Sequence, residues 1–200
     1  GGEIKKYVTI PFYRSYNKIN NEHLISKELL NLYKNFDKTI LCTSINTKLK
    51  NPSNLSMWGL NDLNNYVNSI YSISKKNKDI LFIIKEKKNE LSELSADLYK
   101  NILKRKNIFV VRTQEPKKQY INNFDSLLNI SEMLISMSYR STTIWECLSQ
   151  DKPFIVINDF DERSFLHKYN FETTTDELEN IFNSYLINDK KELSDKLKKF

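Results

Sequence analysis

Residues 133–159 read MLISMSYRSTTIWECLSQDKPFIVIND and hold two short apolar runs with a helical pattern between them. The runs are Met133–Ser136 and Phe154–Ile157, and the helical pattern spans Thr142–Ser149. Strands that are apolar along their whole length are typical of a sheet buried on both faces, and a helical crossover between two such strands makes them parallel. This stretch therefore predicts a β-α-β unit within a parallel sheet.

The same alternation continues toward the N-terminus, with apolar runs at 39–43, 80–84 and 108–111. Crossovers between parallel strands are nearly always right-handed, so we expect an α/β fold: a single Rossmann-like domain whose parallel sheet has five to six strands and helices on both faces. We place this domain at residues 38–200, with an N-terminal strand and helix at 1–37 leading into it. The expected helices lie at 20–36 and around Leu60, Leu63, Val67, Ile70 and Tyr71; Leu91, Leu94, Leu98 and Ile102; Tyr120, Ile121, Phe124, Leu127 and Leu128; and Leu178, Ile181, Phe182 and Tyr185.

The composition excludes several classes of protein. The chain has 3 Gly, and no glycine-rich phosphate loop of the G-x-x-x-x-G-K-[ST] or G-x-G-x-x-G type occurs. Lys+Arg 31 against Asp+Glu 25 leaves a net charge of +6, but the excess is lysine spread along the chain, mostly at predicted helix ends where it favours the helix dipole. We therefore expect no nucleic-acid partner. No apolar run approaches the roughly 18 residues that cross a bilayer, so we expect a soluble, cytoplasmic protein.

The two cysteines, Cys42 and Cys147, fall in an apolar run and in a short helical pattern. Neither belongs to a C-x-x-C motif, so we favour two buried thiols over a disulfide or a catalytic role.

Ligands of an open parallel sheet bind outside the carboxyl ends of its strands. After the first run of the quoted stretch come Ser138, Arg140 and the turn Ser141-Thr142-Thr143, where a helix begins. Ser and Thr are preferred at helix N-termini, whose free N–H groups bind anions. Their hydroxyls and the guanidinium of Arg140 add further hydrogen bonds to a phosphate, which makes this turn the candidate anion site.

Glu146 lies one turn into the same helix, where its carboxylate is placed to accept hydrogen bonds from the vicinal hydroxyls of a ribose. Its neighbour Trp145 is expected to pack or to flank the nucleotide. On spacing alone, a second interpretation stays open, in which Ser and Thr only cap the helix and Glu146 only helps to close the cap.

These residues resemble the nucleotide-sugar-binding motif in the C-terminal half of GT-B glycosyltransferases and of relatives such as the UDP-GlcNAc 2-epimerases. The family pattern is a strand ending in Ser, a Ser/Ser/Thr turn, a helix with Glu before a small residue, a Gly-Lys-Pro and a second strand. The strand end Ile83-Ile84-Lys85 also resembles the lysine of polysaccharide-biosynthesis members, where Lys-Pro-His-Pro is usual. The resemblance covers residues 38–187 as a fold. The matching segments are, in order, Ile135-Ser136, Ser141-Thr142-Thr143, Glu146-Cys147 and Asp151-Lys152-Pro153.

The resemblance implies that Ser141 and Thr142 hold a diphosphate, that Glu146 binds the ribose and that Lys85 belongs to the same site. It implies a nucleotide-sugar donor as substrate, no cofactor and no required metal. The implied function is the donor-nucleotide-binding half of a bacterial glycosyltransferase that transfers a sugar to a surface-polysaccharide acceptor. The acceptor domain would then be a missing N-terminal half, and peripheral membrane association would come through the parent protein.

The chain departs from the family pattern at three places. Asp151 replaces Gly in a turn that accepts Asp, Glu86-Lys87 replaces Pro-His, and no glycine-rich turn follows the run at 39–43. GT-B enzymes also have two Rossmann-like domains, whereas one fits here. We therefore expect the C-terminal half of a larger enzyme, or a reduced relative, that is inactive alone.

Other functions with the same fold remain open. A glycerol-phosphate or ribitol-phosphate transferase, or a sugar-nucleotide epimerase, would use the same nucleotide site. A non-catalytic Rossmann-like binding module would keep the fold without the chemistry.

His167 and Arg163 follow the last run on the ligand side of the sheet and are candidate substrate contacts, with a surface or helix-capping role as the alternative for His167. The acids Asp159, Asp161 and Glu162 have a spacing that suits a divalent metal. We favour for them an acidic cluster at a helix N-terminus, where carboxylates are stabilised by the helix dipole.

Overall fold

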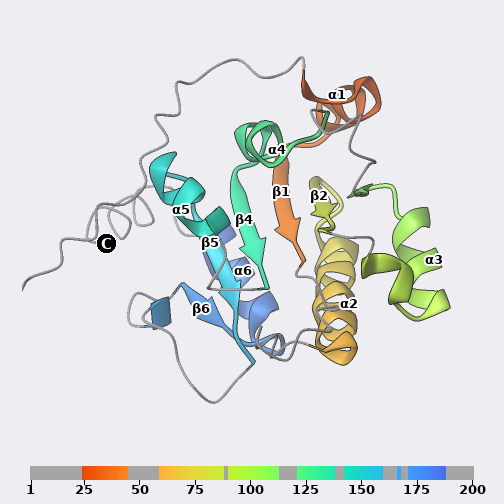
Figure 1. Cartoon of the computed structure of the whole chain (residues 1–200), viewed down its shortest axis with the longest axis vertical. Coiled ribbons are helices and arrows are strands. Elements are labelled where there is room, and N and C mark those ends of the chain that lie inside the picture. Colours follow the sequence, from red (N-terminus) through yellow and green to blue (C-terminus); the bar gives the residue numbers. More distant parts are fainter. Residues whose placement is uncertain are drawn as a thin grey trace, which may run out of the picture.

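The computed structural model describes residues 24–44, 59–87, 90–112, 121–137, 142–159, 166–167 and 171–187 (Figure 1). Their strands form one six-stranded sheet in the order β3-β2-β1-β4-β5-β6, and every neighbouring pair is parallel. This confirms the expected α/β, Rossmann-like fold class. The strands are β1 (Lys38–Thr43), β2 (Ile80–Lys85), β3 (Ile108–Val111), β4 (Met133–Ser136), β5 (Phe154–Ile157) and β6 (Glu172–Thr173).

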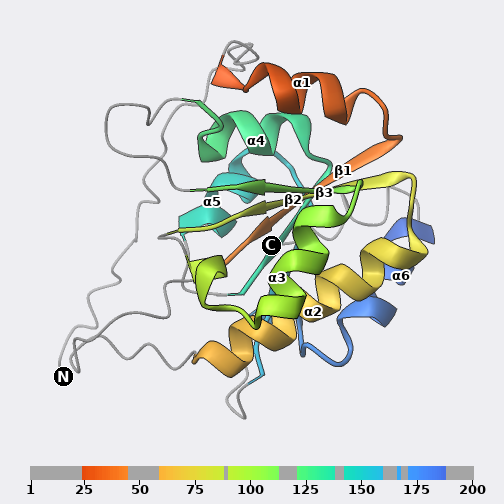
Figure 2. The ribbon, with the colours of Figure 1, turned by 90° about the vertical axis from the view of Figure 1, so that its right-hand side faces the viewer.

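Helices cover both faces of the sheet, as the edge-on view in Figure 2 shows. One face carries α1 (Lys27–Tyr33), α4 (Phe124–Ile130) and α5 (Thr142–Ser149), and the other carries α2 (Leu60–Lys76), α3 (Ala96–Lys104) and α6 (Leu178–Ile187). A single 3-10 turn, η2 (Glu90–Glu93), precedes α3. None of the helices in the described ranges is long and apolar enough to span a bilayer.

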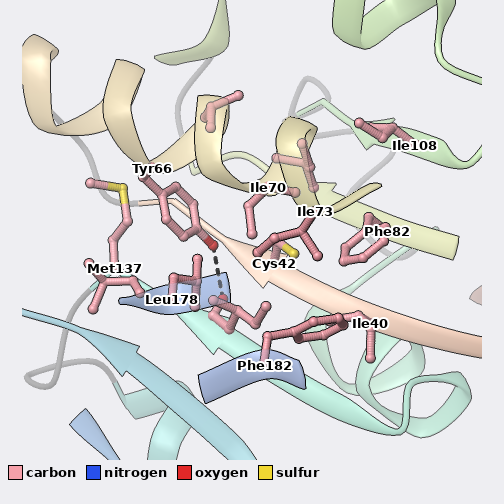
Figure 3. Packing of buried hydrophobic residues seen from close by; sticks show 14 of the residues in the cluster. Ile40, Cys42, Tyr66, Ile70, Ile73, Phe82, Ile108, Met137, Leu178 and Phe182 are labelled. Atoms are coloured by element: carbon pink, nitrogen blue, oxygen red, sulfur yellow. Dashed lines mark hydrogen bonds between the residues drawn. The ribbon is translucent and has the colours of Figure 1, made fainter. Parts of the chain in front are cut away.

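The core consists of two clusters, one on each side of the sheet. The first, shown in part in Figure 3, joins α2, α3 and α6 to the sheet, and the second joins α1, α4 and α5 to it. Alternation along each strand divides its side chains between the two: in β1, Ile40 and Cys42 belong to the first cluster and Leu41 to the second. Because both faces of the central strands are covered, these strands are apolar throughout, which is why they stand out in the sequence.

The first helix is shorter than the helical pattern at 20–36 predicts. It begins at Lys27, because the hydroxyl of Ser26 accepts a hydrogen bond from the Leu29 N–H and caps the helix there. The helix ends at Tyr33. Residues 20–23 lie outside the described residues, as does the expected N-terminal strand.

Two other expected helices are also interrupted by caps. Leu91 belongs to η2, and Ser95 accepts a hydrogen bond from the Leu98 N–H at the start of α3, so the second pattern is two elements. Asn123 caps α4, and Asn122 before it has a φ of 56°, which no helix accommodates. The helical pattern that begins at residue 120 therefore starts four residues too early.

Tyr66 connects α2 to the centre of the sheet (Figure 3). Its fully buried hydroxyl donates a hydrogen bond to the Ile135 carbonyl of β4 at 3.0 Å. Burial raises the pKa of Tyr66 well above its ordinary value of 10.0, with Cys42 adding to the effect, so the phenol remains a donor at any physiological pH.

Replacing this phenol tests how much the connection contributes. Tyr66→Phe should lower the free energy of unfolding by about 0.5–1.5 kcal/mol, the usual net contribution of a buried hydrogen bond. Urea denaturation measures the difference. Tyr71→Phe on the same helix is the control, because its ring under Lys75 is retained. Equal stabilities of the two variants would show that the Tyr66 hydrogen bond contributes nothing.

Candidate functional site

The strand order reverses between β1 and β4. From β1 the chain moves outward through β2 and β3, then crosses to the other side and continues through β4, β5 and β6. In doubly wound sheets of this order, ligands bind at that switch point, outside the carboxyl ends of the strands. The candidate site therefore lies at the carboxyl ends of β1, β2 and β4.

Three polar side chains form a row across this edge. Thr43 at the end of β1 is in register with Lys85 of β2 on one side and with Ser136 of β4 on the other. Neighbouring strands lie about 4.8 Å apart, so the row spans roughly 10 Å. Each of the three follows, two positions later on its strand, a residue of the second core cluster: Leu41, Ile83 or Leu134. Because side chains alternate along a strand, the three polar side chains lie on the face of the sheet that α1, α4 and α5 cover.

The end of β1 holds two hydroxyls without hydrogen-bond partners. Thr43 and Ser44 are each 8% exposed, and neither Thr43 Oγ1 nor Ser44 Oγ makes a hydrogen bond to the described residues. A buried polar group left without a partner costs about 1–3 kcal/mol, and native proteins carry few of them. Two such groups in consecutive residues at the switch point therefore point to a ligand with hydrogen-bonding oxygens.

Lys85 brings a cation to the same row. Its side chain is half-buried, and its Nζ donates a hydrogen bond to the Asn122 carbonyl at 3.4 Å. Burial lowers the pKa of the Lys85 ammonium below its ordinary value of 10.5, and the nearby Glu86 carboxylate raises it partly back. An anion bound here would favour the charged form of Lys85.

Glu86, which stands where the family pattern has Pro, serves the local structure. It is buried and accepts a hydrogen bond from the Leu91 N–H at 3.2 Å, at the start of η2. Glu86 in place of Pro thus leaves Lys85 at the end of β2, and its hydrogen bond to Leu91 holds the segment between β2 and η2.

Helix α5 begins six residues after Ser136, at Thr142. Ile144 and Cys147 pack it onto the sheet in the second core cluster, so its N-terminus lies on the same face as the polar row. Thr143 and Glu146 are both half-buried and, three residues apart, share one flank of the helix.

The sequence left two roles open for Trp145, packing or flanking the nucleotide. Because 54% of Trp145 is exposed on α5, it is not packed into the core, and flanking the nucleotide stays a prediction. The helix buries Ile144 and Cys147, and the position between them in the helical turn faces outward.

The remaining expected site residues are placed only in part. Ser138, Arg140, Ser141 and Arg163 lie outside the described residues. His167 is exposed, next to the buried Leu166 in the connection between β5 and β6.

Lys152 has a role that its place in the motif did not reveal. Its ammonium donates hydrogen bonds to the carbonyls of Leu128 at 2.6 Å and Asn129 at 3.1 Å, and to that of Ser131. These carbonyls lie at the C-terminus of α4, where few backbone donors remain and a cation also opposes the helix dipole. The Asp151 before it has a φ of 53°, which explains why the family pattern has Gly there.

Asp159, the described member of the acidic group, connects the end of β5 to the segment before α6. Its carboxylate accepts hydrogen bonds from the Thr175 N–H at 2.6 Å and from the Thr175 hydroxyl. Asn158 beside it donates to the buried Glu172 of β6 at 2.8 Å, a pair that sequence reasoning missed. Within the described ranges no three His, Cys, Asp or Glu residues are grouped as a metal site requires.

Cys42 and Cys147 are free and buried, which confirms the expectation for both. Burial raises the pKa of each thiol above its ordinary value of 9.0, so both stay protonated and are poor nucleophiles.

Comparison with known proteins gives fold neighbours only. No protein-family model and no curated protein matches the chain. Among solved structures, UDP-GlcNAc 2-epimerase from Neisseria meningitidis, bound to UDP-GlcNAc, has a TM-score of 0.57 at 19% identity over 89% of this chain and 46% of its own. Os79 from O. sativa, in complex with UDP and deoxynivalenol-3-glucoside, has a TM-score of 0.56 at 12% identity over 86% of this chain and 39% of its own.

A third structure shows which part of such proteins the chain corresponds to. The C-terminal domain of a glycosyl transferase group 1 family protein (LpcC) from Francisella tularensis has a TM-score of 0.54 at 9% identity, over 90% of this chain and 92% of that one. The chain spans less than half the length of the epimerase and of Os79. The resemblance found in the sequence is thus confirmed as a likeness of fold to one domain of these proteins.

The structural role of Lys152 is testable by itself. Lys152→Met should lower the free energy of unfolding by about 1–2 kcal/mol, because the C-terminal carbonyls of α4 lose a charged donor. Urea denaturation measures this, with Lys100→Met on the exposed face of α3 as the control. If both variants are equally stable, Lys152 does not hold α4.

Proposed function

We propose that the chain is the donor-nucleotide-binding domain of a GT-B-type glycosyltransferase. The donor's diphosphate lies at the carboxyl ends of β1, β2 and β4, beside the N-terminus of α5. The sugar is transferred to a surface-polysaccharide acceptor held by a second domain. In support, the epimerase and Os79 structures that share this fold contain UDP-GlcNAc and UDP.

The observation that carries the proposal is the pair of buried hydroxyls of Thr43 and Ser44, which have no hydrogen bond among the described residues; Thr43 is also in register with Lys85. Diphosphate oxygens accept hydrogen bonds from hydroxyls, from an ammonium and from the free N–H groups of a helix N-terminus. The row supplies the first two, and α5 begins on the same face with the third.

The other roles follow the family motif. Ser141, Thr142 and Thr143 bind the phosphates with Ser138 and Arg140, and Glu146 binds the ribose. His167 and Arg163 contact the sugar side. The positive groups take over the charge role of a metal, so the site works without one.

Thr43→Val separates ligand binding from stability. UDP, titrated calorimetrically beside CDP and GDP, should bind about 10- to 100-fold more weakly, because a hydrogen bond to a charged group contributes about 1.5–3 kcal/mol. The free energy of unfolding without nucleotide should not fall, because the lost hydroxyl has no partner among the residues that the structure describes.

Thr39→Val is the matched control, since Thr39 is a buried threonine on the same face of β1 at the opposite edge of the sheet. Unchanged UDP affinity in Thr43→Val would contradict the site. If no nucleoside diphosphate binds the wild type at millimolar concentration, the chain is a Rossmann-like module without nucleotide.

The pH dependence of UDP affinity reports on Lys85. Its pKa is lowered in the free protein, and a bound diphosphate raises it again because the anion favours the ammonium. Affinity should therefore be constant below the free-protein pKa and fall as pH rises through it, at lower pH than an ordinary lysine requires. Titrations above pH ~7.5 avoid the phosphate's own pKa near 6.

Lys85→Met should bind UDP more weakly and lose this fall in affinity. Lys78→Met is the control, because Lys78 is an exposed lysine just before β2 at the opposite edge of the sheet. The same pH profile in wild type and Lys85→Met would exclude Lys85 from the site.

A further inference from the structure

Asn122 uses each of its polar groups, and it connects Lys85 to the start of α1. It is 6% exposed. Its backbone N–H donates to the Leu24 carbonyl at 2.6 Å. Its side-chain Oδ1 accepts from the Ser26 N–H at 2.8 Å, and its Nδ2 donates to the Ser26 hydroxyl at 3.2 Å. Its own carbonyl accepts the hydrogen bond from Lys85.

These contacts hold Asn122 in a backbone conformation that few residues adopt. Its φ of 56° lies in the left-handed region, where Asn is enriched but most other side chains are strained. Ser26, which lies 96 residues away in sequence, is itself the cap of α1. The two hydrogen bonds between the Asn122 side chain and Ser26 form a clamp. This clamp on Ser26 fixes both the left-handed turn and the direction in which the Asn122 carbonyl points.

Lys85 needs such a fixed acceptor. A lysine side chain has four rotatable bonds and three N–H donors, and it loses much rotamer freedom when it is held in one place. In the part of the chain that the structure describes, the Asn122 carbonyl is the acceptor of the Lys85 hydrogen bond, and Thr43 is the register neighbour of Lys85. One donor is engaged by Asn122, and the others remain for a ligand over the end of β1.

We propose that Asn122 is a positioning residue, whose backbone carbonyl, fixed by the clamp on Ser26, holds the Lys85 ammonium over the carboxyl end of β1 for contact with the donor's diphosphate. The identity of the anion rests on the proposed function. The positioning of Lys85 does not, because the contact is present in the protein alone. A role for Asn122 confined to fastening α1 is the alternative to be excluded.

Asn122→Gly is the variant to test, because Gly adopts the left-handed conformation freely but makes no clamp on Ser26. NMR of the Lys85 side chain, labelled at 13Cε, measures its pKa in the protein without ligand. A carbonyl accepts a stronger hydrogen bond from the charged ammonium than from the neutral amine, and so favours the charged form. Loss of the fixed carbonyl should therefore lower the pKa of Lys85 further, with its charged neighbour Glu86 unchanged.

UDP titration of the same variant gives the second readout. Its dissociation constant should rise about 3- to 10-fold above pH ~8, and less at pH ~7, where Lys85 is protonated in either protein. In a Lys85→Met background, Asn122→Gly should have no further effect on UDP binding, because the two residues act through one contact.

Asn107→Ala is the matched control. Asn107 is also a buried asparagine with several side-chain hydrogen bonds, to the carbonyls of Ser74, Asn77 and Ile80, but it precedes β3 at the opposite edge of the sheet. It should lower stability and leave the pKa of Lys85 as it is. Should Asn122→Gly fail to fold, Ser26→Ala removes part of the clamp from the other side, and Ser26→Thr, which keeps a hydroxyl, should restore the wild-type pKa.

An unchanged Lys85 pKa in Asn122→Gly, or an equal change in Asn107→Ala, would overturn the positioning role. If wild-type protein does not bind UDP but the pKa of Lys85 falls in Asn122→Gly, the proposed function fails while the positioning stands.

Discussion

The parallel pairing of β1 with β2 on one side and with β4 on the other is the constraint on which the site depends. This pairing puts Thr43 in register with both Lys85 and Ser136, although these residues are far apart in the sequence. It also puts the reversal of strand order between β1 and β4, so the carboxyl end of β1 lies where the crossovers diverge to the two sides. The buried phenol of Tyr66, bonded to the Ile135 carbonyl, reinforces this junction from the other face.

The same junction is where the protein gives up stability. Thr43 and Ser44 bury hydroxyls without partners, and burial disfavours the charged form of Lys85. Elsewhere in the described part of the chain, Arg105 Nε is the one other buried polar side-chain atom without a hydrogen bond, whereas Asn107 bonds carbonyls at the end of α2 and Lys152 bonds carbonyls at the end of α4. Two unpartnered hydroxyls and a half-buried lysine gathered at one edge of the sheet are typical of a binding site.

Sequence reasoning recovered what depends on local pattern. The strands were visible because both their faces are buried, and Lys85 was found because it ends an apolar run. Helix starts were misplaced because a single capping residue, such as Ser26, determines where a helix begins, even where the apolar periodicity extends further toward the N-terminus. Thr43 was missed because a threonine at the end of a strand is an ordinary strand residue. The clamp between Asn122 and Ser26 joins residues 96 apart and exists only in the folded chain.

An NMR titration of backbone amides with UDP tests the central claim most directly. If the diphosphate lies at the switch point, the largest shifts should fall at the carboxyl ends of β1, β2 and β4, on Ser44 and Glu86 among others, and in the first turns of α5 up to Glu146. Shifts at the opposite edge of the sheet, around Asn107, or none with millimolar UDP, would contradict the assignment of this edge as a nucleotide site.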